Sequence, residues 1–100
     1  MITIRRTSTN ITIKGHSTDA NTPRTYESSQ ACAAVTALAN ALIFGIQDEL
    51  AENAPYFVEK GDFSMDTTQL TEKGLLLVNV FTRTARELAK AYAEYITVEG

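Results

Sequence analysis

The chain has 100 residues, of which 44% are hydrophobic, and its formal net charge is −3 with a pI near 5.0. This length predicts a single domain over residues 1–100 with one modest core. The acidic balance argues against nucleic acid as a partner, because nucleic-acid-binding proteins gather Lys and Arg on one face. The longest apolar run, residues 74–81, is far shorter than the ~20 residues that cross a bilayer, so we expect no membrane partner.

The chain contains one cysteine and one histidine. A single cysteine cannot form an internal disulfide, and the first residues lack the charged and apolar regions of a signal peptide, so we expect a cytoplasmic protein. A structural zinc site needs four ligands, and the sequence has no glycine-rich phosphate loop. We therefore expect neither a metal nor a cofactor.

The beginning of the chain predicts a β-hairpin. Residues 2–6 and 11–14 alternate apolar and polar side chains, and residues 7–10 between them have a turn-like composition. Gly15 ends the second strand, where a glycine permits a backbone conformation or a close approach that a side chain would block. It can therefore set the direction of the loop that follows His16.

The next stretch, residues 17–27, predicts an exposed loop. Its residues are mostly polar or small, and Pro23 disfavours helix at the residue before it. A loop of this size is either a lid or binding segment, or a surface insertion without a function. Both interpretations stay open on composition, although the only histidine and the only cysteine flank the loop.

The first predicted helix runs from about Ser29 to about Ala51. Small residues around Cys32 allow another backbone to approach closely, and Gly45 is tolerated inside a helix at ~1 kcal/mol relative to alanine, which permits a bend or a shortened helix. Ser28 or Ser29 can cap the N-terminus, and apolar residues recur at helical spacing, namely Val35, Leu38, Leu42 and Ile46.

The second half of the chain predicts another hairpin and another helix. Residues 56–60 and 63–66 flank a Gly-Asp turn as strands. The second helix begins near Thr68 or Thr71 and ends around Glu94, because apolar residues recur along it at helical spacing.

The element order defines the expected fold class. Residues 95–100 either extend the second helix or add a short edge strand. The order ββαββα predicts an α/β fold of the α+β type, a two-layer sandwich of about four mostly antiparallel strands with both helices on one face.

His16 and Cys32 are the fewest parts that can make an activated sulfur nucleophile. A thiol of ordinary pKa ~8.5 is only a few per cent thiolate at neutral pH, and ionising half of it takes about 2 kcal/mol. A position in the first helical turn supplies ~0.3 to 1 kcal/mol. A neighbouring imidazolium supplies up to ~4 kcal/mol at about 4 Å and an effective dielectric of about 20, so the histidine is required. Free N–H groups at the helix start could hold an oxyanion, and this chemistry is typical of acyl transfer.

The competing interpretation of the same two residues is structural. Cys32 is then a buried small residue in a tight helix contact, because free cysteine is among the most buried residue types. His16 in that case merely ends a strand. Composition alone favours this second interpretation.

Two short motifs resemble a known family. GHS at residues 15–17 and ACAAVTAL at residues 31–38 are similar to the GHA and CAAVSAL signatures of the ribosomal-processing cysteine proteases, the Prp family. The resemblance covers nearly the whole chain in length and element order. It implies that His16 and Cys32 form a catalytic dyad, and it also implies a homodimer, no metal or cofactor, and a cytoplasmic location.

The resemblance also implies a protein substrate. The family removes a short N-terminal extension from a ribosomal large-subunit protein, and related enzymes act on phage capsid or scaffold precursors. Residues next to the dyad would then bind substrate or support the site, namely Gly15, Ser17, Glu27, Ser29, Ala31 and Thr36.

The sequence departs from the family pattern near the cysteine. Ser29 stands where the family usually has an aspartate, and Thr36 replaces a serine but keeps a hydroxyl. Another group must then orient the imidazole, and Glu27 and Asp19 are the candidates.

The leading hypothesis is a small cysteine endopeptidase in which residues 17–27 form a lid. Its rivals are a catalytically silent relative that binds peptides through the same groove, and a purely structural dimer in which Cys32 is buried.

Overall fold

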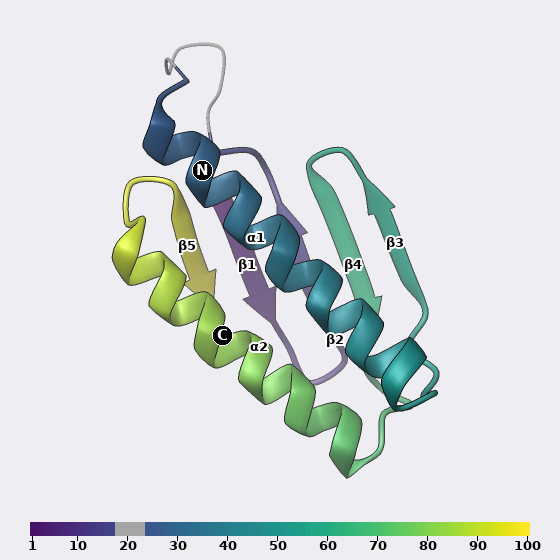
Figure 1. Ribbon diagram of the computed structural model, residues 1–100. Helices are drawn as coiled ribbons and strands as arrows, with labels where there is room; N and C mark the ends of the chain where they lie inside the picture. The colour runs from purple at the N-terminus through teal and green to yellow at the C-terminus, as the bar shows by residue number, and fades with distance from the viewer. Residues whose placement is uncertain (18–23) are drawn as a thin grey trace.

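The computed structural model describes residues 1–17 and 24–100 (Figure 1). Within these residues the chain forms a five-stranded sheet covered by two helices, with a short π-helical turn after the first helix. The elements follow one another as β1 (Ile2–Arg6), β2 (Asn10–Lys14), α1 (Tyr26–Phe44), η1 (Gly45–Glu49), β3 (Tyr56–Glu59), β4 (Asp62–Asp66), α2 (Glu72–Ala91) and β5 (Ile96–Glu99).

The strands lie in the order β3-β4-β2-β1-β5. β5 pairs parallel with β1, and the other neighbours are antiparallel. Both helices lie on the same face of the sheet (Figure 1). The predicted two-layer α+β class is confirmed. Of the two alternatives for the C-terminal residues, an extended second helix or a short edge strand, the structure has the strand, because these residues form β5 at one edge of the sheet.

The core lies between the sheet and the helices. The alternation predicted for the first hairpin is confirmed, since Ile4 and Ile13 are paired across β1 and β2 and are 1% and 8% exposed. Fully burying one such side chain contributes roughly 1.5–3 kcal/mol. The helices supply the opposite wall of the core, with Val35, Leu42, Ile43, Ile46, Val78, Phe81 and Ala85.

Helix α1 begins earlier than expected. Thr25 is its N-cap, and the Thr25 hydroxyl accepts a hydrogen bond from the Ser28 N–H at 3.1 Å while the Thr25 N–H donates to Ser28 Oγ at 2.8 Å. The predicted cap at Ser28 or Ser29 is therefore wrong. Two hydroxyl residues three apart satisfy two backbone donors together, which favours the earlier start. Cys32 consequently lies in the second turn of α1 instead of the first.

The end of α1 also differs from the predicted regular helix to Ala51. The α-helix ends at Phe44 and continues as the π-helical turn η1. A Cβ at Gly45 would lie 2.9 Å from Leu77 Cδ1, so the glycine allows α1 to pass close to α2 there. The shortened helix that Gly45 permitted is the one observed.

Helix α2 begins after Thr71, as predicted, and ends at Ala91, three residues before the expected end. The side chain of Glu52 caps it from outside the helix, since Oε1 accepts from the Thr71 N–H at 2.7 Å and Oε2 accepts from the Thr71 hydroxyl at 2.6 Å. The Thr71 hydroxyl and N–H hold the pKa of the Glu52 carboxyl below its ordinary value. This contact ties the end of the α1 segment to the start of α2.

An 18-residue window within the helical stretch Tyr26–Glu49 has a mean hydropathy of 1.6, so the stretch is long and apolar enough, by length and composition only, to cross a membrane. The stretch holds no long continuous apolar run, because Ser, Thr, Gln and Asn interrupt it. A core helix packed on a sheet passes the same test. Here 33% of that window is buried inside the fold, with Val35 and Leu42 on the sheet side.

Candidate active site

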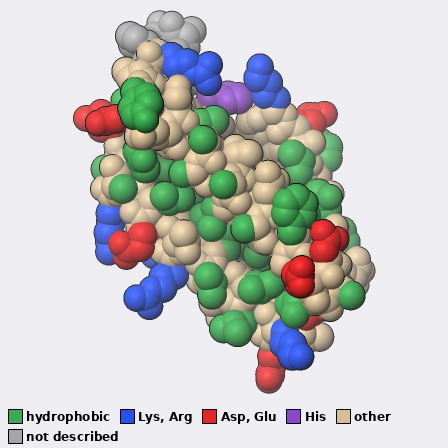
Figure 2. All heavy atoms as spheres, viewed as in Figure 1, with side chains coloured by type: hydrophobic (Ala, Val, Ile, Leu, Met, Phe, Trp, Pro, Cys, Tyr) green, Lys and Arg blue, Asp and Glu red, His purple; other side chains and the backbone are tan. Residues whose placement is uncertain are grey.

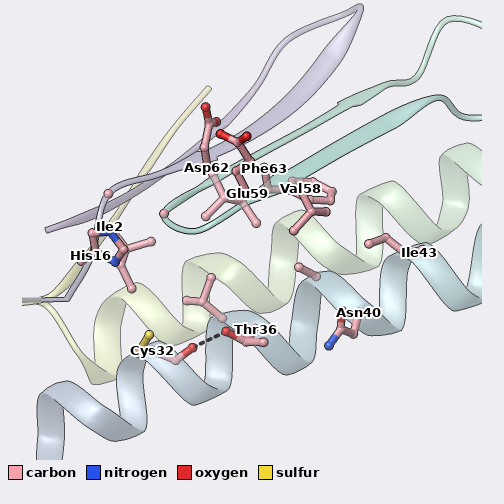
Figure 3. A pocket seen from close by; sticks show the side chains of 15 residues that line it. Ile2, His16, Cys32, Thr36, Asn40, Ile43, Val58, Glu59, Asp62 and Phe63 are labelled. Carbon is pink, nitrogen blue, oxygen red and sulfur yellow. Dashed lines mark hydrogen bonds between the residues drawn. The ribbon is translucent and has the colours of Figure 1, made fainter.

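A cavity of about 150 Å³ lies between α1 and the strands, and both His16 and Cys32 line it (Figure 3). The sheet contributes its floor, α1 one wall, and the β3–β4 hairpin the other. The two residues that the sequence singled out are therefore brought together from opposite sides of one space. Its other lining residues are Ile2, Ile13, Gly15, Val35, Thr36, Ala39, Asn40, Ile43, Val58, Glu59, Gly61, Asp62 and Phe63.

The backbone around Gly15 fixes the position of His16. Gly15 has a φ of 95°, and a Cβ there would overlap the carbonyl oxygen of Met1. Its N–H donates to Gly61 O at 2.9 Å, and the amino group of Met1 donates to His16 O at 2.6 Å. The predicted role of Gly15, to set the chain direction at His16, agrees with these contacts, since only glycine combines that conformation with that approach.

The His16 ring packs against Gly61 in the turn between β3 and β4. A Cβ at Gly61 would overlap Nε2 of the ring, and Gly61 has a φ of 76°. The glycine therefore makes room for the imidazole as well as closing the hairpin. Sequence reasoning found only the second role, because no local pattern indicates that residue 61 meets residue 16.

Cys32 lies on the cavity side of α1. Its side chain is partly exposed, and Figure 3 shows Sγ on the side of the helix that faces His16. The neighbouring Ala31 and Val35 are buried on the core side, at 0% and 5% exposed. Cys32 is therefore not the fully buried cysteine of the structural interpretation, and its thiol can be reached from the cavity.

The second-turn position of Cys32 changes the electrostatic argument. The macrodipole acts mainly within the first turn, so α1 stabilises a thiolate at Cys32 less than expected. The N–H groups at the start of α1 are also engaged in part, because Ser28 and Ser29 donate to Thr25 Oγ1 and Thr25 O, both at 3.1 Å. The expected oxyanion site at the helix start is therefore not available from these two groups.

The His16 ring and Cys32 Sγ are not hydrogen-bonded to each other within the part of the chain that the structure describes. The nearby Thr36 hydroxyl donates to Cys32 O at 2.9 Å, which secures the cysteine backbone and occupies that hydroxyl (Figure 3). His16 is exposed to solvent in this arrangement. Catalytic hydrogen bonds are often long without substrate and shorten when it binds.

The other residues expected to support the site are placed differently. Ser17 is buried, at 8% exposed, next to His16. Glu27 and Ser29 lie on the first turns of α1 and do not line the cavity, and Asp19, like most of the predicted lid at 17–27, lies outside the described residues. Glu27, the one candidate for orienting the imidazole that the structure describes, is thus not brought to the cavity that His16 lines.

Two carboxylates that the sequence reasoning did not single out line the cavity. Glu59 and Asp62 face each other across the β3–β4 hairpin, and Lys14 is the partner of Asp62 on β2. In Figure 3 both carboxylates point away from Cys32. They form a polar rim at the His16 end, whereas the far end of the cavity, at Ala39, Ile43 and Val58, is apolar apart from Asn40.

One thiol and one imidazole that share a cavity on a two-layer α+β domain define a candidate cysteine-dependent hydrolase. The family model described as cysteine protease Prp matches residues 1–97. The chain therefore belongs to the cysteine protease Prp family, and the enzyme class is that of a peptidase acting through cysteine. The resemblance stated from the GHS and ACAAVTAL motifs is confirmed.

Solved structures show the same fold. An essential ribosomal processing protease Prp from Staphylococcus aureus, in complex with a covalently linked product peptide, has a TM-score of 0.78 at 17% identity, over 99% of this chain and 98% of that one. The protein SMU.848 from Streptococcus mutans has a TM-score of 0.78 at 21% identity, over 98% and 90%. The same S. aureus protease with a substrate peptide has a TM-score of 0.74 at 14% identity, over 99% and 97%. A search of curated protein sequences gives no match.

Proposed function

We propose that this protein is a cysteine endopeptidase that removes a short N-terminal extension from a ribosomal large-subunit protein, or from a related phage capsid or scaffold precursor. Cys32 is the nucleophile, and His16 is the general base and then the general acid. The observation that carries the proposal is the shared cavity of the only histidine and the only cysteine. The S. aureus relative, a ribosomal processing protease crystallised with substrate and product peptides, supports the choice of substrate.

The reaction follows from the chemistry of the two groups. Cys32 Sγ, its proton transferred to His16, attacks the peptide carbonyl carbon and forms a C–S bond. His16 then donates the proton to the leaving amine as the C–N bond breaks, and water, deprotonated by His16, releases the acyl group from sulfur. Because α1 contributes little at the second turn, the imidazolium must supply most of the ~2 kcal/mol that thiolate formation takes.

The protease is proposed to act in the cytoplasm as a homodimer, as the family resemblance implies. The surface that supports a dimer is the outer side of the helical layer. No charged residue occurs between Gln30 and Gln47, and Phe44 on α1 and Leu76 and Val80 on α2 are 57%, 60% and 54% exposed. Figure 2 shows hydrophobic side chains along this side of the molecule. Exposed apolar surface of this kind marks an interaction site.

Light scattering after size-exclusion chromatography tests the dimer. The wild-type protein should have twice the chain mass of 11.0 kDa, and Phe44→Glu should shift it to the monomer. Tyr26→Glu changes a side chain that is 79% exposed at the other end of α1 and is the matched control. A monomeric wild-type protein, or a dimer that Phe44→Glu leaves intact, counts against this face.

Mass spectrometry of peptide products tests the activity. The substrates are synthetic peptides that join the N-terminal extension of a ribosomal large-subunit protein, or of a phage precursor, to the first residues of the mature protein. The wild-type enzyme should release the extension, while Cys32→Ala and His16→Ala should not. Cleavage that persists in Cys32→Ala refutes the assignment.

The second candidate is a peptide-binding relative without activity. Two observations favour it, the lack of a hydrogen bond between the His16 ring and Cys32 Sγ among the described residues, and the serine at position 29. Binding of the intact peptide to the wild-type protein, without any cleavage over hours, would select this alternative.

A further inference from the structure

Among the residues that the structure describes, strand β3 is an open edge of the sheet. All four of its residues are exposed, whereas its neighbour β4 buries Phe63 and Met65 at 6% and 1%. The opposite edge differs, because β5 buries Ile96 at 2% and packs against α2. An edge strand presents unpaired backbone N–H and C=O groups, which are a template for another extended chain.

The pairing register shows which groups of β3 face outward. The Asp66 N–H donates to Pro55 O at 2.8 Å, so these two residues form a hydrogen-bonded pair. Pairs in an antiparallel ladder alternate between bonded and non-bonded, and the next pair, Tyr56 with Met65, is of the second kind. By this alternation, the backbone groups of Phe57 and Glu59 form hydrogen bonds with β4. The backbone N–H and C=O groups of Tyr56 and Val58 point to the open side.

The same two residues place their side chains next to the candidate active site. Tyr56 and Val58 are the partners of the buried Met65 and Phe63, so their side chains lie on the face of the sheet that carries the helices. They remain 44% and 57% exposed because α1 does not cover β3. Val58 lines the cavity that contains Cys32 (Figure 3).

The hairpin also connects this edge to the imidazole. Beyond Glu59 the chain turns at Gly61, whose Cα lies against the His16 ring. Val58 is three residues from Gly61, so an extended chain paired with the edge would have about 10 Å to travel before it reaches the level of His16. The open edge therefore leads to the catalytic end of the cavity.

We propose that the open edge of β3 binds the substrate as an added strand, through the backbone groups of Tyr56 and Val58. This inference rests on the proposed peptidase function and extends it. The paired substrate segment lies a few residues away from the scissile bond, and every second side chain of the segment faces the apolar side of the cavity at Val58. Backbone pairing supplies affinity, and the alternate side chains supply selectivity.

A proline substitution tests the outward N–H. Val58→Pro removes that donor, and proline is tolerated on an edge strand where its N–H faces solvent. Val58→Ala removes side-chain contact but keeps the donor, so it is the matched control. Relative to Val58→Ala, Val58→Pro should raise the Kd of the uncleaved peptide for a Cys32→Ala background by about 2- to 10-fold, the effect of one backbone hydrogen bond. Equal Kd values in the two variants overturn the proposal.

Modified substrates give a second measurement that does not depend on folding of a variant. N-methylation of successive substrate amides should weaken binding to the Cys32→Ala protein at alternate positions of the paired segment, because only alternate residues of a strand face the partner. The pairing is contradicted if affinity falls without this alternation, or if no N-methylated peptide loses affinity. A peptide that binds with the alternation but is never cut by the wild-type enzyme refutes the peptidase function and leaves the edge pairing intact.

A second copy of the chain is the competing occupant. If Val58→Pro converts a dimer into a monomer in light scattering while peptide binding is unchanged, β3 pairs with another copy and the proposal is wrong. The expected result is an unchanged mass.

Discussion

Replacing Gly61 by alanine should damage catalysis far more than folding. A Cβ at position 61 would overlap Nε2 of the His16 ring, so the ring must leave its place. The backbone has a φ of 76°, a left-handed conformation that costs a residue with a Cβ about 1–2 kcal/mol. For a domain of this size that penalty lowers Tm by about 4–16 °C. Acid–base catalysis contributes about 10²- to 10⁴-fold, so displacing the imidazole should lower kcat/KM by at least about 10-fold.

Two further glycine variants separate backbone strain from the ring contact. Gly61→Asn accepts the left-handed conformation more readily than alanine, so it should recover part of the stability but none of the activity. Gly45→Ala lies in a right-handed helical conformation, where the nearest atom is the end of the Leu77 side chain, and it should leave kcat/KM within about twofold. Peptide cleavage and thermal unfolding are measured on the same samples. A folded Gly61→Ala enzyme with wild-type kcat/KM would refute the assigned packing of His16.

The remaining predictions concern stability. Glu52 has a pKa lowered from its ordinary 4.5 by the Thr71 hydroxyl and N–H, so its contribution is present above about pH 4.5 and is lost as the pH falls through the folded-state value. Urea unfolding of Glu52→Gln should therefore show lower stability than the wild type at pH 7 and a smaller difference below pH 4; an equal difference at both pH values would contradict this. Thr25→Ala removes the N-cap of α1 and should cost about 0.5–2 kcal/mol in the free energy of unfolding, with Thr25→Ser restoring most of it; an unchanged Tm in Thr25→Ala would show that another residue caps the helix.

The hairpins were predictable because their signal is local. Alternation in residues 2–6 and 11–14 fixes which side chains enter the core, and a glycine marks the turn of the second hairpin. The start of α1 was missed for the opposite reason. Thr25 and Ser28 are both good N-caps, and the choice between them depends on a reciprocal pair of hydrogen bonds that composition does not rank.

The two candidate catalytic residues were predictable from the sequence, but the residues that surround them in the cavity were not. The only histidine and the only cysteine could be named from their chemistry, whereas the contact of Gly61 with the His16 ring joins residues 45 positions apart. The same limit applies to Glu59, Asp62 and Val58, which reach the cavity only because β4 pairs with β2. Tertiary contacts of this kind leave no trace in local spacing.

The central claim is that the imidazole of His16 activates the thiol of Cys32, and the rate of iodoacetamide alkylation at pH 6 tests it most directly. An ordinary thiol is under about 1% thiolate at that pH and reacts slowly. The wild-type protein should react at least about tenfold faster than His16→Gln, and His16→Gln should react as slowly as a small-molecule thiol. Equal, slow rates in the two proteins would contradict the claim.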